Sequence, residues 1–196
     1  MSPPTTKRVA TRQRFVDTAM TLFRDLGYGS TSMAQIAQAA EGSRANLYLY
    51  FSSKAQIVIA RMLEIESELR SLYDSLDSLE EYTLDSLVAW LGESRRMWLT
   101  YRAEFEAMIQ AMSVDGEVRE SWLATSRRVC RSMTAPYRGC TSAAERLDAE
   151  VHMMTLMAGL EHNFSLLYVH GYTADEERVL KALAKQWLPL FGTAGR

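Results

Sequence analysis

The feature that most constrains this chain is a long stretch without proline. Residues 5–135 contain none, and the four prolines of the sequence stand at positions 3, 4, 136 and 189. Leu, Ala, Met, Glu and Arg fill the stretch, and apolar residues recur every third or fourth position rather than every second. Since proline breaks helices and this period is that of a helix, the sequence predicts an all-α protein of about nine helices.

Caps and glycines divide the stretch into helices. We expect the first four over Lys7–Leu26, Ser32–Ala39, Arg44–Tyr50 and from Ser53 to Leu76. Ser32 with Gln35 fits a capping box, and Gly27 and Gly42 break the chain before the second and third helices. Further helices are predicted near 81–92, 94–113, 117–135, 142–170 and 174–191, with breaks at Gly92, at residues 115–116 and 136–141, and at Gly171. No linker rich in glycine or proline follows, so the long fourth helix is expected to join residues 1–54 to a second domain, residues 55–196.

The charge of the chain is unevenly distributed. Residues 1–54 carry seven Lys and Arg residues against three Asp and Glu residues, a net charge of +4. The whole chain has a formal net charge of −2, so the remainder is acidic. A basic segment attached to an acidic body is typical of a module that binds a polyanion.

Two short helices joined by a turn of about four residues, within Thr31–Lys54, predict a helix-turn-helix whose second helix enters the major groove of DNA. Arg44 can pair with guanine, Asn46 with adenine, and Ser43 can reach a base or a phosphate. Tyr48, Tyr50 and Lys54 offer donors for phosphates. Two alternatives stay open: Tyr48 as a packed aromatic, and Arg44 as a phosphate contact. The candidate DNA-binding residues are Thr31, Ser32, Ser43, Arg44, Ala45, Asn46, Tyr48, Tyr50 and Lys54.

This segment closely resembles the TetR family of transcriptional regulators. The family pattern T-[ST]-x-x-x-I-A-x-x-A-G-V-S-x-G-x-L-Y-x-[YH]-F-x-[ST]-K is matched at Thr31, Ser32, Ile36, Ala37, Ala40, Ser43, Leu47, Tyr48, Tyr50, Phe51, Ser53 and Lys54. Ala19, Leu22, Phe23, Gly27 and Tyr28 match the preceding helix. The chain departs at Glu41 and Gly42, where the family has Gly-Val, and at Ala45, where it has Gly; the added methyl group of Ala45 can meet a thymine methyl. The resemblance implies a repressor that binds a pseudo-palindromic operator as a homodimer and is released by a small molecule.

Large apolar side chains fall on one face of residues 90–112, provided that the helix continues through Gly92. Such a stripe is either ordinary core or the wall of a ligand pocket. The resemblance favours a pocket for an apolar effector, because TetR-like proteins hold a cavity between the fourth helix and the middle helices. The candidate ligand-binding residues are Trp90, Met97, Trp98, Tyr101, Phe105, Met108, Trp122, Met157, Leu160 and Phe164. Residues 113–192 also resemble the C-terminal domain of the mycobacterial ethionamide regulators, which implies a long lipophilic channel, although Met157 and Leu160 replace asparagines of that channel.

The segment Val151–Tyr172 is apolar around nearly the whole helix, so one side is expected to need a partner. TetR-like dimers are built from their last two long helices, which agrees with this expectation. The predicted dimer-interface residues are Val151, Thr155, Ala158, His162, Ser165, Val179, Leu183, Trp187 and Leu190.

Other classes of function are less well supported by the sequence. The three histidines at positions 152, 162 and 170 lie on one helix without a nucleophile, and no HExxH, P-loop or GxSxG motif occurs, so we expect neither an enzyme nor a metal or other cofactor. Metal binding by His162, His170 and Glu161 is the weaker alternative, as is a helical adaptor without DNA binding. Cys130 and Cys140 fit reduced thiols. No run of about 18 apolar residues is present and Met1–Arg14 is polar, so we expect a cytoplasmic protein without a membrane partner.

Overall fold

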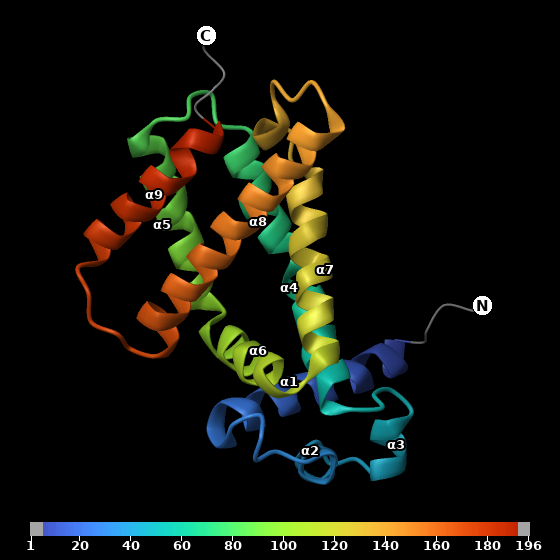
Figure 1. Cartoon of the computed structure of the whole chain (residues 1–196). Helices are drawn as coiled ribbons and strands as arrows, with labels where there is room; N and C mark the ends of the chain where they lie inside the picture. Colours follow the sequence, from blue (N-terminus) through green and yellow to red (C-terminus); the bar gives the residue numbers. More distant parts are fainter. Residues whose placement is uncertain (1–5, 192–196) are drawn as a thin grey trace. The chain divides into compact units, whose positions relative to one another are not determined.

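A computed structural model describes residues 6–191, and these form nine α-helices and no strand, which confirms the predicted all-α fold (Figure 1). Pro3 and Pro4 lie outside the described residues, as does Gly192. The helices are α1 (Thr6–Leu26), α2 (Met33–Ala39), α3 (Arg44–Tyr48), α4 (Lys54–Asp77), α5 (Leu84–Thr100), α6 (Arg102–Val114), α7 (Gly116–Ser132), α8 (Ala143–Phe164) and α9 (Glu176–Phe191). A short 3₁₀ turn, η1 (Ala135–Tyr137), precedes α8, and a π-helical turn, η2 (Ser165–Val169), follows it.

The predicted break at Gly92 is wrong. Helix α5 runs through this residue and ends only at Tyr101. One helical face buries Leu87, Trp90, Leu91, Ser94 and Trp98, on both sides of the glycine. A glycine inside a helix costs only about 1 kcal/mol relative to alanine, less than burial of one such side chain contributes, so packing outweighs propensity here.

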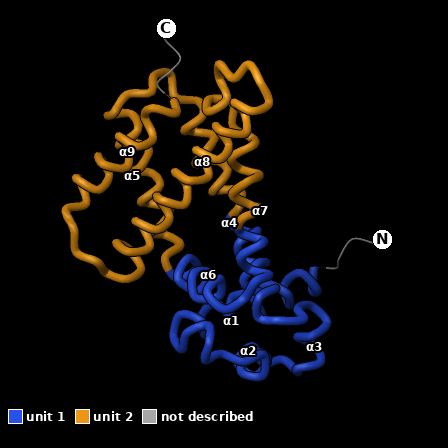
Figure 2. Tube along the Cα trace, in the orientation of Figure 1, with its two compact units in different colours: residues 1–65, 103–122 blue, residues 66–102, 123–196 orange. Residues whose placement is uncertain are grey.

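The described chain divides into two compact units, coloured separately in Figure 2. Unit 1 comprises residues 1–65 and 103–122, and unit 2 comprises residues 66–102 and 123–196. The division falls within α4 and adds α6 to the N-terminal helices, so it differs from the predicted boundary between residues 54 and 55. This division reflects packing and not function. The division into a DNA-binding domain, residues 1–54, and a second domain, residues 55–196, therefore stays a prediction.

Unit 1 is built around the apolar face of α1. Phe15 and Phe23 of α1, Ile36 of α2 and Leu47 of α3 are buried. A Cβ atom at Gly42 would lie 2.9 Å from the ring of Phe15, so the close approach of the turn to α1 requires glycine. The valine usual in the TetR pattern therefore has no room here.

Unit 2 has an aromatic centre between α4, α5 and α9. The ring of Trp187 lies 4.9 Å from that of Trp90, 6.5 Å from that of Tyr73 and 6.2 Å from that of Phe191. The indole nitrogen of Trp90 donates a hydrogen bond to the carbonyl oxygen of Leu72 over 2.8 Å. This packing holds α9 against α5 (Figure 1).

Candidate nucleic-acid interface

Helices α2 and α3 form the predicted helix-turn-helix, and side chains cap both of them. The capping box at α2 is confirmed: the Ser32 hydroxyl accepts from the amide of Gln35 (3.2 Å), and the Gln35 side chain accepts from the amide of Ser32 (2.8 Å). The Ser43 hydroxyl accepts from the amide of Asn46 over 3.1 Å at the start of α3. The residue of the turn with left-handed backbone is Glu41, with φ of 52°. Caps and turn together fix the direction of α3.

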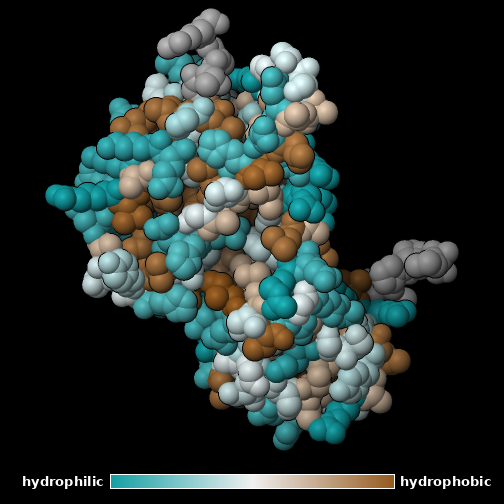
Figure 3. Space-filling view, viewed as in Figure 1, coloured by the Kyte–Doolittle hydropathy of each residue, from teal (hydrophilic) through white to brown (hydrophobic). Residues whose placement is uncertain are grey.

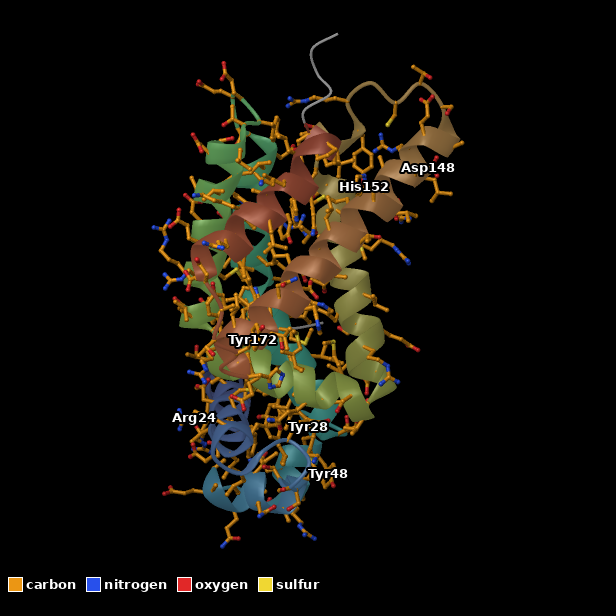
Figure 4. The ribbon with its side chains drawn as sticks, turned by 60° about the vertical axis from the view of Figure 1, so that its left-hand side comes forward. Arg24, Tyr28, Tyr48, Asp148, His152 and Tyr172 are labelled. Atoms are coloured by element: carbon orange, nitrogen blue, oxygen red, sulfur yellow. The ribbon has the colours of Figure 1, made fainter. Side chains whose placement is uncertain are left out.

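Helix α3 exposes the side chains that were predicted to read DNA. Leu47 is fully buried and attaches the helix to unit 1, whereas Arg44, Ala45 and Tyr48 are exposed. Ser43 is also exposed and Asn46 is half-buried. Tyr48 is 54% exposed, which excludes the alternative of a packed aromatic, and Figure 4 labels it on this helix. The helix therefore presents a guanidinium group, hydroxyl groups and an amide on its outer face.

The structure contradicts the prediction for Thr31, whereas the role of Tyr50 stays a prediction. The Thr31 side chain is 2% exposed, and its hydroxyl donates to the carbonyl oxygen of Gly27 over 2.9 Å, so it closes the turn after α1 and is not available to DNA. Tyr50 is half-buried with its ring 5.9 Å from that of Phe15, and the guanidinium group of Arg8 lies over it. Ser32 is exposed, but its hydroxyl is already used in the cap.

Lys54 has a structural role that the sequence did not show. Its ammonium group donates to the carbonyl oxygen of Tyr28 over 2.6 Å and lies 4.5 Å from the centre of the Tyr28 ring. Partial burial lowers the pKa of Lys54, and the negative charge of Asp115 partly offsets this. The ammonium group thus holds the segment between α1 and α2 to the start of α4.

Tyr28 is bound from a third side by residues distant in sequence. Its amide donates to the side-chain oxygen of Gln110 over 2.8 Å, and its hydroxyl lies 3.4 Å from a carboxylate oxygen of Asp115. Burial, reinforced by Asp115, raises the pKa of Tyr28 to about 12. Tyr28, labelled in Figure 4, therefore connects the helix-turn-helix to α4 and to the end of α6 within unit 1. The sequence carried no signal for Gln110 or Asp115, since only folding brings them to Tyr28.

The predicted stripe over residues 90–112 does not lie on one helix, because α5 ends at Thr100 and α6 begins at Arg102. The ten predicted ligand-binding residues also divide between the two units. Phe105, Met108 and Trp122 belong to unit 1, and the other seven belong to unit 2: Trp90, Met97, Trp98, Tyr101, Met157, Leu160 and Phe164. Met97 and Tyr101 are half-buried and the rest are buried. Trp90 packs in the aromatic centre of unit 2, and the rings of Trp98 and Phe164 lie edge to face at 6.0 Å. Trp90 is thus a core residue.

A pocket of about 380 Å³ lies elsewhere in unit 2. It is lined by residues around η1, the first half of α8 and the end of α9: Pro136, Arg138, Gly139, Cys140, Glu145, Ala149, His152, Pro189 and Leu190. Leu190 lines this pocket, although the sequence analysis predicted it as a residue of the dimer interface. Figure 4 labels His152 on α8.

The predicted interface residues separate into three groups by their exposure. Val151, Thr155, Ala158 and His162 are exposed and share one face of α8, which Leu147, 59% exposed, extends. Leu183, Trp187 and Ser165 are buried within the chain, with Trp187 only 1% exposed, so their assignment to an interface is wrong. The amphipathic α9 buries its large side chains against α5 and needs no partner for them. Val179 and Leu190 are half-buried.

Three further findings concern metal ions, membrane spans and cysteines. They contain no group of three or more His, Cys, Asp or Glu side chains that could hold a metal ion. Within residues 6–191 no helix is long and apolar enough to cross a membrane. Both cysteines are free, and the Sγ atom of the buried Cys130 lies 3.1 Å from the hydroxyl oxygen of Tyr137.

Comparison with known proteins bears on the capped turn and on the exposed face of α3. Residues 15–60 match the model of the bacterial regulatory proteins of the tetR family. The N-terminal segment of the chain is thus similar to the tetR family. It is 32% identical over 98 residues to the HTH-type transcriptional regulator AcrR of Shigella flexneri, a region covering 45% of this chain and 46% of AcrR. It is 28% identical over 89 residues to the HTH-type negative transcriptional regulator IcaR of the biofilm operon icaADBC in Staphylococcus aureus, covering 42% of this chain and 44% of IcaR.

A similarity of fold extends over most of the chain. A solved tetR-family transcriptional regulator from Streptomyces coelicolor matches with a TM-score of 0.65 at 18% identity, over 93% of this chain and 80% of that one. At this identity the likeness concerns the fold alone. The sequence matches span less than half the length of the two curated relatives, both described as transcriptional regulators and not as enzymes. The narrower likeness to the ethionamide regulators is not supported by these matches and stays a prediction.

Proposed function

We propose that this protein is a tetR-type transcriptional repressor that binds a pseudo-palindromic operator as a homodimer through α3. The observation that carries the proposal is the outer face of α3, where Ser43, Arg44 and Tyr48 are exposed between two capped helix ends. These side chains supply the donors that base edges and phosphates accept. The basic charge of the N-terminal segment favours the same partner.

Selection from random-sequence duplexes tests DNA binding directly. We expect one enriched palindrome, with Arg44→Ala losing discrimination at one base pair of each half-site, at a cost of about 1–3 kcal/mol for removal of a bidentate pair with guanine. Arg178→Ala in α9 also removes an exposed guanidinium group and serves as the control. A uniform loss over all sequences in Arg44→Ala would assign Arg44 to a phosphate, and no enrichment at all would refute DNA recognition.

The dimer proposal rests on the exposed face of α8. Val151 is 58% exposed although apolar, and Thr155, Ala158 and His162 continue the same face. Figure 3 shows apolar and neutral side chains among polar ones over this part of the surface. Pairing this face of α8 with a second copy buries its apolar groups. An obligate interface of this kind covers more than about 2,000 Å². Two recognition helices then address half-sites about one DNA turn apart.

Sedimentation velocity at micromolar concentration tests this assembly. We expect a dimer for the natural protein and a monomer for Ala158→Arg, because the arginine places a charge in the centre of the face. Ala124→Arg on the exposed side of α7 is the matched control and should remain dimeric. A natural protein that sediments as a monomer would refute the dimer proposal.

Release by an apolar small molecule is the third part of the proposed function. Within unit 2, Trp98, Met157, Leu160 and Phe164 supply apolar and aromatic surface of the kind that lines ligand sites. All four are buried, so an effector must displace side chains, and it shifts the equilibrium only by its difference in affinity for the two states. Titration of apolar compounds against the operator complex tests this, and Leu160→Phe, which fills space, should weaken the response while DNA affinity is kept.

A further inference from the structure

The outer face of α3 carries apolar side chains as well as donors. Leu49 is 75% exposed, the largest exposed fraction among the large apolar side chains of the described residues. It caps α3 with helical backbone angles, φ of −69° and ψ of −19°, so it continues the helical row that begins at Ala45. Arg44 and Tyr48, also four residues apart, form the neighbouring polar row. Leu47 is the inward-facing residue, so packing within unit 1 does not account for the exposed leucine.

We infer that the apolar row of Ala45 and Leu49 reads the 5-methyl groups of two thymines in each operator half-site. This inference rests on the proposed function and names a base preference of that site. Thymine alone presents a methyl group in the major groove, and apolar side chains recognise it by contact. Residues four apart on a helix have Cβ atoms about 5–6 Å apart. Successive base pairs rise by about 3.4 Å, so the two side chains reach methyl groups one or two base pairs apart.

DNA suits this row better than a protein partner. A specific protein interface covers on the order of 1,000 Å² or more, whereas the row consists of one leucine and one alanine. The same helix offers the exposed Arg44 and Ser43 beside the row, and these match base edges. The apolar row therefore fits small apolar groups set between hydrogen-bonding groups, which is the pattern of the major groove.

Replacement of single thymines by deoxyuridine in the selected operator tests the inference, because it removes the methyl group and leaves base pairing intact. We expect the dissociation constant to rise about fourfold at one or two positions of each half-site, the value for burial of one methyl group. Leu49→Ala should bind the thymine operator more weakly and should lose its sensitivity to deoxyuridine at one of these positions. Ala45→Gly should lose it at the other.

Leu63→Ala is the control, since Leu63 is a leucine of α4 that is 53% exposed. It should keep the full response to deoxyuridine. If no thymine position responds in the natural protein, or if Leu49→Ala keeps the full response, the inference is refuted while the proposed function stands. If no duplex is bound selectively, the proposed function falls, and this inference falls with it.

Discussion

The contact between Lys54 and Tyr28 permits a test between two roles for one lysine. The sequence predicts a phosphate contact for Lys54, whereas the structure places its ammonium group 2.6 Å from the carbonyl oxygen of Tyr28 and over the Tyr28 ring. Lys54→Met keeps the aliphatic stem and removes the charge. We expect it to lower the free energy of unfolding by about 1.5–2 kcal/mol, the lower part of the range for a charged hydrogen bond, because the group is only part-buried.

Urea denaturation measures this change as a lower midpoint at constant slope. Operator binding at several salt concentrations then separates the roles. If Lys54 binds a phosphate in each half-site, its replacement reduces the slope of log affinity against log salt by about 0.9 for each phosphate. If Lys54 acts only as an internal clamp, its replacement weakens binding and leaves the slope unchanged. Lys185→Met, at an exposed position of α9, controls for the removal of a charge. A Lys54→Met protein as stable as the natural one, with a reduced slope, would refute the clamp.

Three further outcomes follow from the packing. Trp187→Ala should lower the free energy of unfolding by about 3–5 kcal/mol in thermal or urea denaturation. The folded variant should remain a dimer. A stably folded monomer would instead show that Trp187 belongs to the dimer interface. Gly42→Val should cost about 1–3 kcal/mol because its side chain meets Phe15, whereas Gly29→Ala, with nothing within 4 Å, should cost less than half as much; equal costs would contradict the close approach. Arg128 lowers the pKa of Glu66, so the stability that Glu66 adds is present above the pKa of its unfolded form and is lost as the pH falls through the folded pKa. The difference in stability between the natural protein and Glu66→Gln should therefore shrink in acid, and a constant difference from pH 7 to pH 3 would exclude this ion pair.

Local sequence patterns determined the helices and the recognition element. The capping box at Ser32, the cap at Ser43 and the buried Leu47 depend on residues within four positions of one another, and such short-range interactions can be read from the chain directly. The exposed outer face of α3 follows from them, because one inward side chain on so short a helix sets the direction of all the others.

Only the tertiary structure decided which apolar faces meet inside the chain. Periodicity shows that a helix has an apolar side but not what covers it, so Trp187 was assigned to an interface although α5 and Tyr73 cover it. Gly92 likewise predicted a break that the burial of Trp90 and Trp98 overrides. Lys54, Gln110 and Asp115 gather around Tyr28 from positions as far as 87 residues away. Such contacts depend on the path of the whole chain, and no local pattern encodes them.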